Sequence, residues 1–141
     1  MSMWLEYAKV SEATLEAVRK DDAVAQALFF GEEGKPADFD AGKDVIGLDY
    51  RTLSAMLEGM EEAGIDCSWT RRAIGEEYGD ALSFELTYGP AFFFTVEEVA
   101  ELAAGLSAEE GWDPDDDFEE NIARFFVQAA KEKKAVIGGV N

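Results

Sequence analysis

Residues 82–99 decide the fold of this chain, and they read LSFELTYGPAFFFTVEEV. Phe84, Leu86 and Tyr88 alternate with Ser, Glu and Thr, and this period of two is typical of a strand that buries one face. The Gly-Pro pair that follows Tyr88 predicts a turn, because Gly accepts a positive φ and Pro cannot donate a hydrogen bond to a sheet. The three consecutive phenylalanines after the turn predict a second strand.

A helix is expected to follow this second strand directly. Thr95 and Glu98 have the spacing of a capping box, in which each side chain accepts a hydrogen bond from the other residue's backbone N–H. Residues 96–106 then place their large apolar side chains three and four positions apart, on one face of a helix. The stretch from Leu82 to Leu106 therefore predicts strand, turn, strand and helix.

A longer helix is expected earlier in the chain, at residues 43–63. Its apolar side chains step by three and four, and Gly64 is a typical residue at the end of a helix. The side chains expected on its buried face are Ile46, Tyr50, Leu53, Leu57 and Met60.

The remaining elements complete a fold of mixed composition. Residues 65–81 predict a loop, or a loop with a short helix. We expect the aspartates at 115–117 to cap the last helix, and Gly138-Gly139 to weaken the end of the last strand. The expected order β-α-α-α-β-β-α-α-β predicts an α+β fold, a single domain over residues 1–141 with helices packed on a small mixed sheet of about four strands. The strands are expected at 3–10, 82–88, 92–94 and 135–137, and the helices at 12–20, 23–30, 43–63, 96–106 and 118–134.

Length and composition indicate a globular protein. The chain has 141 residues, of which 48% are hydrophobic, and this is enough to bury a sizeable core. No apolar run reaches the roughly 18 residues that a membrane-spanning helix needs. No signal peptide is visible at the start, and Cys67 is the single cysteine, so no disulfide forms within the chain. These features predict a cytoplasmic protein.

Charge is the most unusual property of the sequence. Lys and Arg number 12 and Asp and Glu number 31, which gives a formal net charge of −19. Residues 73–123 contain 15 of the acids and no Lys or Arg. A field of this sign repels nucleic acids and anionic membranes and attracts basic proteins. Alternatively, the acidity serves only to keep the domain soluble.

Several short patterns, in the same order along the chain, resemble the YfbM-like family of small bacterial proteins of unknown function. Tyr88-Gly89-Pro90-Ala91, followed by an aromatic strand and a Thr-x-Glu-Glu-Val helix start, is similar to the family's pattern. The segments 3–15, 43–50 and 112–114, and the last helix with the strand after it, also resemble it. The resemblance covers nearly the whole chain, and it brings no established reaction.

The chain departs from the family pattern where a site would need side chains. Val45-Ile46 stands where the family has Trp-His, Asp49 stands where it has a second His, and Phe92 stands where it has Arg. The chain contains no histidine at all. Any site that the family builds from those side chains is therefore absent or rebuilt here.

The known patterns of cofactor and metal sites do not fit the sequence. Cys67 has no histidine to act as its base, and zinc would lack His and a second Cys. The aspartates at 113, 115 and 117 have the first spacings of a calcium loop, but Phe118 replaces the required Gly and Arg124 replaces the final Glu. The glycines of 31–34 lack the Lys-Ser/Thr ending of a phosphate loop. We therefore expect no metal and no cofactor.

One group of residues is a candidate binding site because it falls on the two segments that most resemble the family. Lys43, Asp49, Tyr50 and Tyr88 are expected to meet where a helix face lies beside a strand end. Alternatively, the two tyrosines are core aromatics and the two charged residues lie on the surface.

Three functional hypotheses follow. The first is a non-enzymatic acidic module that binds a basic protein partner, in the manner of immunity or inhibitor proteins. The alternative is a small-molecule enzyme that uses carboxylates and tyrosines in a cleft near Tyr88, and the third is a mimic of nucleic acid. We expect no binding to nucleic acid or membrane. The acidic partner face is expected to comprise Glu109, Glu110, Asp113, Asp115, Asp116 and Asp117.

Overall fold

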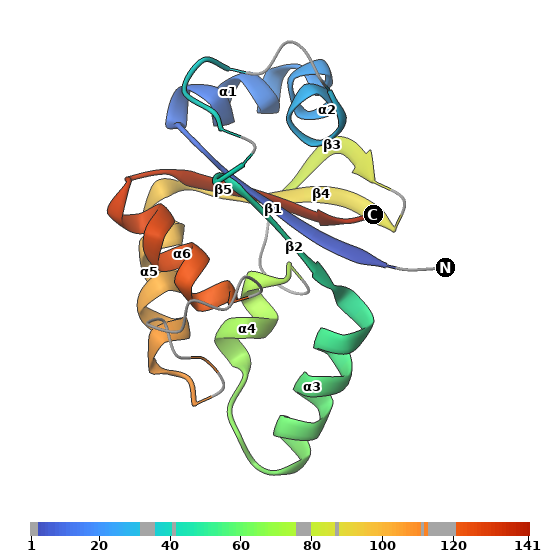
Figure 1. Cartoon of the computed structure of the whole chain (residues 1–141), viewed down its shortest axis with the longest axis vertical. Helices are drawn as coiled ribbons and strands as arrows, with labels where there is room; N and C mark the ends of the chain where they lie inside the picture. Colours follow the sequence, from blue (N-terminus) through green and yellow to red (C-terminus); the bar gives the residue numbers. More distant parts are fainter. Residues whose placement is uncertain are drawn as a thin grey trace.

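The described strands form one sheet, and helices cover both of its faces (Figure 1). The computed structural model describes residues 3–31, 36–40, 42–75, 80–86, 88–110, 112 and 121–141. In chain order the elements are β1 (Trp4–Val10), α1 (Glu12–Lys20), α2 (Asp22–Phe30), β2 (Val45–Asp49), α3 (Tyr50–Glu62), α4 (Ser68–Ala73), β3 (Asp80–Leu86), β4 (Gly89–Phe94), α5 (Val96–Ala108), α6 (Ile122–Lys131) and β5 (Ala135–Val140).

The sheet has five strands in the order β2-β1-β5-β4-β3. Each neighbouring pair is antiparallel, with Leu5 opposite Val140 in the β1–β5 pair and Phe93 opposite Ile137 in the β4–β5 pair. The α+β class is confirmed. The described sheet is antiparallel where we expected a mixed one, and it gains a strand from a segment whose pattern we interpreted as helical.

That additional strand is β2, and it corrects the expected helix at 43–63. Val45 and Ile46 are β-branched and Gly47 is a poor helix former, so these residues pair with β1 instead. Asp49 is extended, and its Oδ1 accepts a hydrogen bond from the backbone N–H of Thr52 at 3.1 Å. It therefore caps a helix that starts only at Tyr50. From there the predicted face holds, since Leu53 and Leu57 are buried.

The sheet is covered on both faces, which gives the molecule three layers (Figure 1). One apolar cluster lies between the sheet and α3, α4, α5 and α6, and the other between the sheet and α1 and α2. Phe92 and Phe94 belong to the first cluster and Phe93 to the second, so all three phenylalanines of β4 are buried. The expected alternation holds for Phe84 and Leu86, which are both buried, and ends before Tyr88, which is 39% exposed at the turn.

Tyr7 of β1 is buried in the centre of the larger cluster. Its hydroxyl donates a hydrogen bond to the carbonyl of Ala73 in α4, at 2.7 Å. Its ring contacts Phe92 of β4 and Phe125 and Phe126 of α6. One side chain thus joins the sheet to two helices.

The glycines of β5 have a role that the sequence pattern did not predict. The strand continues through them to Val140, instead of weakening after Ile137. A Cβ added at Gly138 would lie 2.9 Å from atoms of both Phe92 and Tyr7, so the missing side chain makes room for two rings.

The last helix begins later than expected. Asn121 is extended and its side chain accepts a hydrogen bond from the backbone N–H of Arg124, so this residue caps α6. The aspartates at 115–117, to which we had assigned this role, lie outside the described residues. The expected short helix in 65–81 is confirmed as α4, and the capping box of Thr95 and Glu98 is confirmed at the start of α5.

Among the described residues, no helix has the length and apolar character needed to cross a membrane.

Gly138→Ala is expected to lower the free energy of unfolding by about 1–3 kcal/mol, because the added methyl group overpacks the rings of Tyr7 and Phe92. Denaturant unfolding of the wild type and the variant measures this. Gly59→Ala is the matched control: no atom lies within 4 Å of its Cβ position in α3, so this change should stabilise by up to about 1 kcal/mol. Equal effects of the two substitutions would contradict the packing argument.

Candidate functional site

A cavity of about 410 Å³ is lined by residues between α3 and α4 and at the end of α5. These segments lie at the end of the molecule away from α1 and α2 (Figure 1). The cavity opens between the loop that follows α3, the first turn of α4 and the last turn of α5. The residues that line it are Gly64, Ile65, Asp66, Trp69, Gly105, Ala108, Glu109 and Glu110.

Two carboxylates fix the start of α4 beside this cavity. Asp66 Oδ1 accepts a hydrogen bond from the backbone N–H of Ser68 at 2.9 Å. Glu109 Oε1 accepts from the backbone N–H groups of Trp69 and Thr70, and its Oε2 accepts from the hydroxyl of Thr70 at 2.6 Å. Three N–H groups that the helix itself leaves without partners are thereby satisfied. The hydrogen bonds from Ser68 lower the pKa of Asp66, so this side chain is charged at neutral pH.

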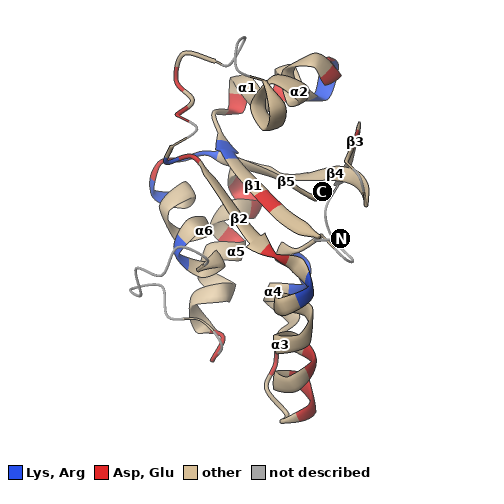
Figure 2. Cartoon of the chain, turned by 45° about the vertical axis from the view of Figure 1, so that its right-hand side comes forward, with Lys and Arg blue, Asp and Glu red and all other residues tan. Residues whose placement is uncertain are grey.

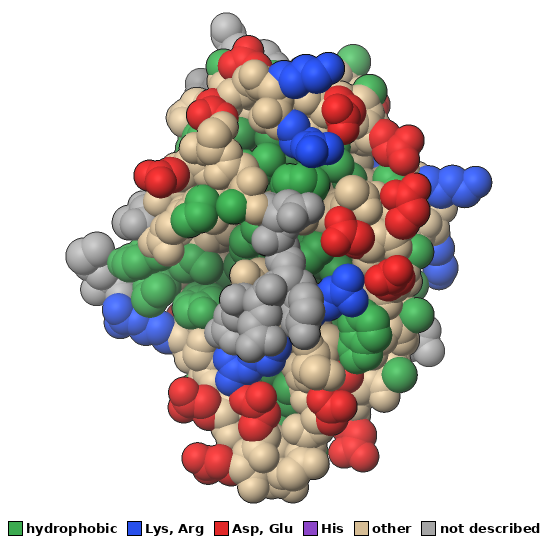
Figure 3. All heavy atoms as spheres, turned by 180° about the vertical axis from the view of Figure 1, so that it is seen from behind, with side chains coloured by type: hydrophobic (Ala, Val, Ile, Leu, Met, Phe, Trp, Pro, Cys, Tyr) green, Lys and Arg blue, Asp and Glu red, His purple; other side chains and the backbone are tan. Residues whose placement is uncertain are grey.

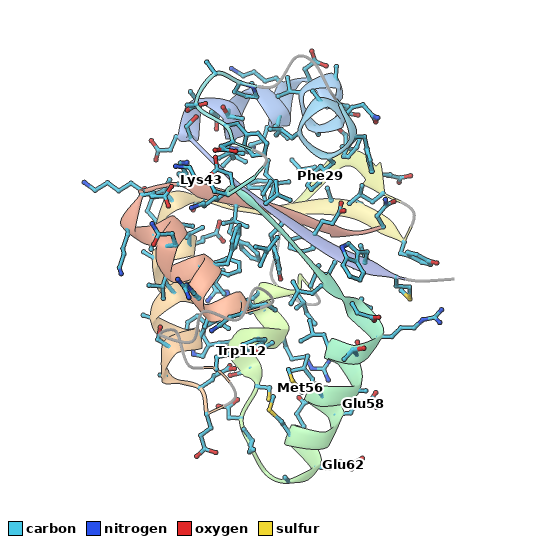
Figure 4. The ribbon with its side chains drawn as sticks, viewed as in Figure 1. Phe29, Lys43, Met56, Glu58, Glu62 and Trp112 are labelled. Atoms are coloured by element: carbon cyan, nitrogen blue, oxygen red, sulfur yellow. The ribbon has the colours of Figure 1, made fainter. Side chains whose placement is uncertain are left out.

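The aromatic side of the cavity is built around Trp69. A Cβ added at Gly105 would overlap the Trp69 ring, so the indole packs directly on the backbone of α5. The guanidinium of Arg72 lies 5.3 Å from the centre of a Trp69 ring, within the range of a cation–π contact. Trp112 donates from Nε1 to the hydroxyl of Thr70 at 2.8 Å and so supports the same turn of α4 (Figure 4).

Acidic side chains gather at this end of the molecule (Figures 2 and 3). Two of them are neutralised within the chain, since Arg71 pairs with Glu61 and Arg72 pairs with Glu101. Asp66 and Glu110 line the cavity itself, and none of its described lining residues is Lys or Arg. We call the exposed acids of α3, the α3–α4 loop, α5 and the residues just after α5 the acidic pole. They are Glu58, Glu61, Glu62, Asp66, Glu101 and Glu110.

Cys67 lies beside the cavity but is buried. Its burial and the neighbouring carboxylates of Glu109 and Glu61 raise the pKa of the thiol. The reactive thiolate is therefore disfavoured, and the geometry gives Cys67 no role as a nucleophile.

The expected acidic partner face is only partly described. Glu110 is exposed, as that expectation requires. Glu109 is 8% exposed and caps α4, so it does not contribute to an exposed face. Asp113, Asp115, Asp116 and Asp117 lie outside the described residues. We did not include the acids of α3 in the expected partner face, because we placed that face in the segment that contains no Lys or Arg.

The four residues of the predicted binding group are not brought together. Asp49 lies opposite Trp4, and the backbone N–H of Tyr88 donates to Val140, so Asp49, Tyr50 and Tyr88 lie at one end of the sheet. Asp49 and Tyr88 are nevertheless three strand spacings apart, or about 14 Å.

Lys43 precedes β2, at the opposite end of that strand from Asp49. β2 alone spans about 13 Å from Val45 to Asp49, and Lys43 lies beyond its first residue. Figure 4 also shows Lys43 far from Glu58 and Glu62 of the acidic pole. Among the described residues, Lys43 and Tyr88 therefore do not meet beside one helix face, because the segment predicted as the start of that helix is β2.

A second group of charged side chains, which the sequence did not reveal, lies where β1 ends. Lys9 is 3% exposed and donates to Glu132 at 2.5 Å. Asp44 is fully buried and lies 3.7 Å from Lys9 and 3.4 Å from Lys134. The two cations and two carboxylates neutralise one another and tie the start of β2 to β1 and to the α6–β5 connection. We interpret this group as structural.

Neither a metal site nor a match to a known protein identifies the chemistry of this cavity. Among the described residues, no three Cys, Asp or Glu side chains are placed to hold a metal ion. Comparisons with protein-family models, curated proteins and solved structures found no match. The resemblance to the YfbM-like family therefore stays a prediction.

The charged group of Lys9 predicts a specific dependence of stability on pH. Although burial opposes the charged form, hydrogen bonds from Lys9, Gln128 and Lys134 lower the pKa of Glu132 from 4.5 to about 2. A carboxylate with a lowered pKa contributes stability above its unfolded value of 4.5, and the contribution is lost as pH falls towards 2. Glu132→Gln should therefore lower the free energy of unfolding by about 1–3 kcal/mol at neutral pH, with the difference shrinking towards pH 2.

Denaturant titrations at several pH values measure this difference. Glu16→Gln is the matched control, since Glu16 forms an exposed pair with Arg19 and its loss should change stability by less than about 0.5 kcal/mol. A Glu132→Gln effect that is constant across this pH range would show that its charge does not stabilise the fold.

Proposed function

We propose that this chain is a non-enzymatic, cytoplasmic binding module whose acidic pole takes a basic segment of a partner protein. The observation that carries the proposal is the cavity in the acidic pole, which offers two exposed carboxylates beside an indole. Lys and Arg side chains suit this combination, because the charged group pairs with a carboxylate while the methylene chain lies on the aromatic ring.

The construction of the cavity favours binding over solubility as the role of its acids. Glu109 is held by three hydrogen bonds from α4, so the cavity keeps its shape without a ligand. Asp66 and Glu110 are exposed at its opening, where they have lost little hydration. A preformed site of this kind loses little conformational entropy on binding.

The chemistry of the partner follows from charge. A net charge of −19 disfavours nucleic acid and anionic membranes and speeds association with a basic protein. The enzyme alternative is less favoured, because Lys43 and Tyr88 belong to opposite ends of the sheet and Cys67 is buried. Immunity and inhibitor proteins act by this type of engagement, and we propose the same type for this chain.

A capped hexa-arginine peptide tests the proposal, with binding followed by NMR of the protein's backbone and indole N–H groups. We expect saturable shifts centred on Trp69 and Glu110, weakening as salt is added. Asp66→Asn with Glu110→Gln should weaken binding by at least about fivefold, or about 1 kcal/mol. Asn at position 66 keeps an acceptor for the Ser68 N–H group, so α4 should remain capped.

The control variant has the same change in net charge, but its substitutions lie away from the acidic pole. Glu12→Gln with Glu85→Gln removes two exposed acids from α1 and β3 and should change the affinity by less than about twofold. Equal weakening by both pairs, or shifts spread evenly over the surface, would mean that only the overall charge attracts the peptide.

A further inference from the structure

Glu6 of β1 is a carboxylate in an apolar position of the sheet. Ala8 and Val10, two and four residues further along the strand, belong to the cluster under α1 and α2, so Glu6 is directed to the same side of the sheet. The side chain is partly buried, and its Oε2 is buried without a hydrogen-bond partner. Among the described residues, no Lys or Arg forms an ion pair with it.

Glycines on both neighbouring strands shape the space around this carboxylate. Glu6 lies opposite Gly47 of β2 and Gly139 of β5. A Cβ added at Gly47 would overlap the indole Nε1 of Trp4, and one added at Gly139 would overlap Cδ1 of Leu86. The indole and the leucine therefore lie over the two glycines, on either side of the Glu6 position in β1.

This arrangement is costly for the free protein. A carboxylate oxygen that is shielded from water and has no donor loses hydration without compensation. In agreement with this cost, burial raises the pKa of Glu6. A cation that brought its own N–H donors would recover the lost interaction. Rotation about the last side-chain torsion exchanges the two oxygens, so Oε2 can turn towards such a donor.

An exposed indole, that of Trp4, lies on the same side of β1 as Glu6. Trp4 is 39% exposed although its indole lies against Gly47, so one part of the residue packs on β2 and another part meets solvent. An exposed indole beside a carboxylate attracts an organic cation through its ring face. Lys9, the next basic residue on β1, belongs to the opposite side of the sheet and pairs with Glu132.

We propose that Glu6 and Trp4 form a binding site for a small organic ammonium ion. The ammonium group donates to the Glu6 carboxylate, and the apolar substituent lies against Trp4 and Leu86. This site lies across the sheet from the acidic pole and does not depend on the function proposed there.

Benzylammonium and benzyl alcohol are a matched pair of probes, because they share the aromatic ring and differ in charge. Titrations are followed by the backbone and indole N–H signals and by the Glu6 carboxyl carbon in isotope-labelled protein. We expect saturable shifts with benzylammonium, at about millimolar affinity, at Trp4, Glu6, Gly47 and Gly139. Benzyl alcohol should bind at least about tenfold more weakly, because it lacks the charge that Glu6 recognises.

Glu6→Gln removes the charge and keeps the shape, and it should weaken benzylammonium binding by at least about tenfold. Asp66→Asn with Glu110→Gln should leave this binding unchanged, which separates the site from the acidic pole. If Glu6→Gln fails to fold, the carboxyl-carbon shift of the wild type with each probe decides the question. Equal shifts with both probes, retention of binding in folded Glu6→Gln, or shifts centred on Trp69 would each overturn the proposal.

Discussion

The burial of Tyr7 is the constraint on which the rest of the structure depends. Its hydroxyl is buried and must find an acceptor, and it finds one in the carbonyl of Ala73 at the end of α4. Glu109 holds the other end of the same helix. A six-residue helix that would not persist alone is thus fixed at both ends, and the cavity beside Trp69 has a defined shape because of it.

The sequence predicted those elements whose local signals agree with their packing. The capping box at Thr95 and the amphipathic α6 are of this kind. The prediction failed where one apolar pattern is compatible with both a helix and a strand. The apolar period that begins at Ile46 fits a helix, but the segment forms β2, because Gly47 disfavours a helix and Asp49 caps α3 only at Tyr50. The site was harder to predict, because the cavity joins residues about 40 positions apart, and no local pattern records that Glu109 reaches Thr70.

The acids of this chain fall into two physical classes that composition alone cannot separate. Glu109 and Glu132 are held by several donors each, and their charges are part of the fold. Glu110 and Asp66, the latter hydrogen-bonded among the described residues only to Ser68 at the start of α4, remain exposed beside an apolar surface, where a second molecule can reach them. A strongly negative net charge therefore says less about binding than the hydrogen bonds that each carboxylate already accepts.

The central β1–β5 pair has a consequence for how the protein is made. Trp4 and Asn141 exchange backbone hydrogen bonds, although almost the whole chain separates them. During translation β1 can pair with β2, and β3 can pair with β4, but these two strand pairs have no common neighbour until β5 has left the ribosome. Until then the aromatic faces of both strand pairs are open to water and to other nascent chains, so synthesis of β5 completes the sheet in a single step after the other four strands.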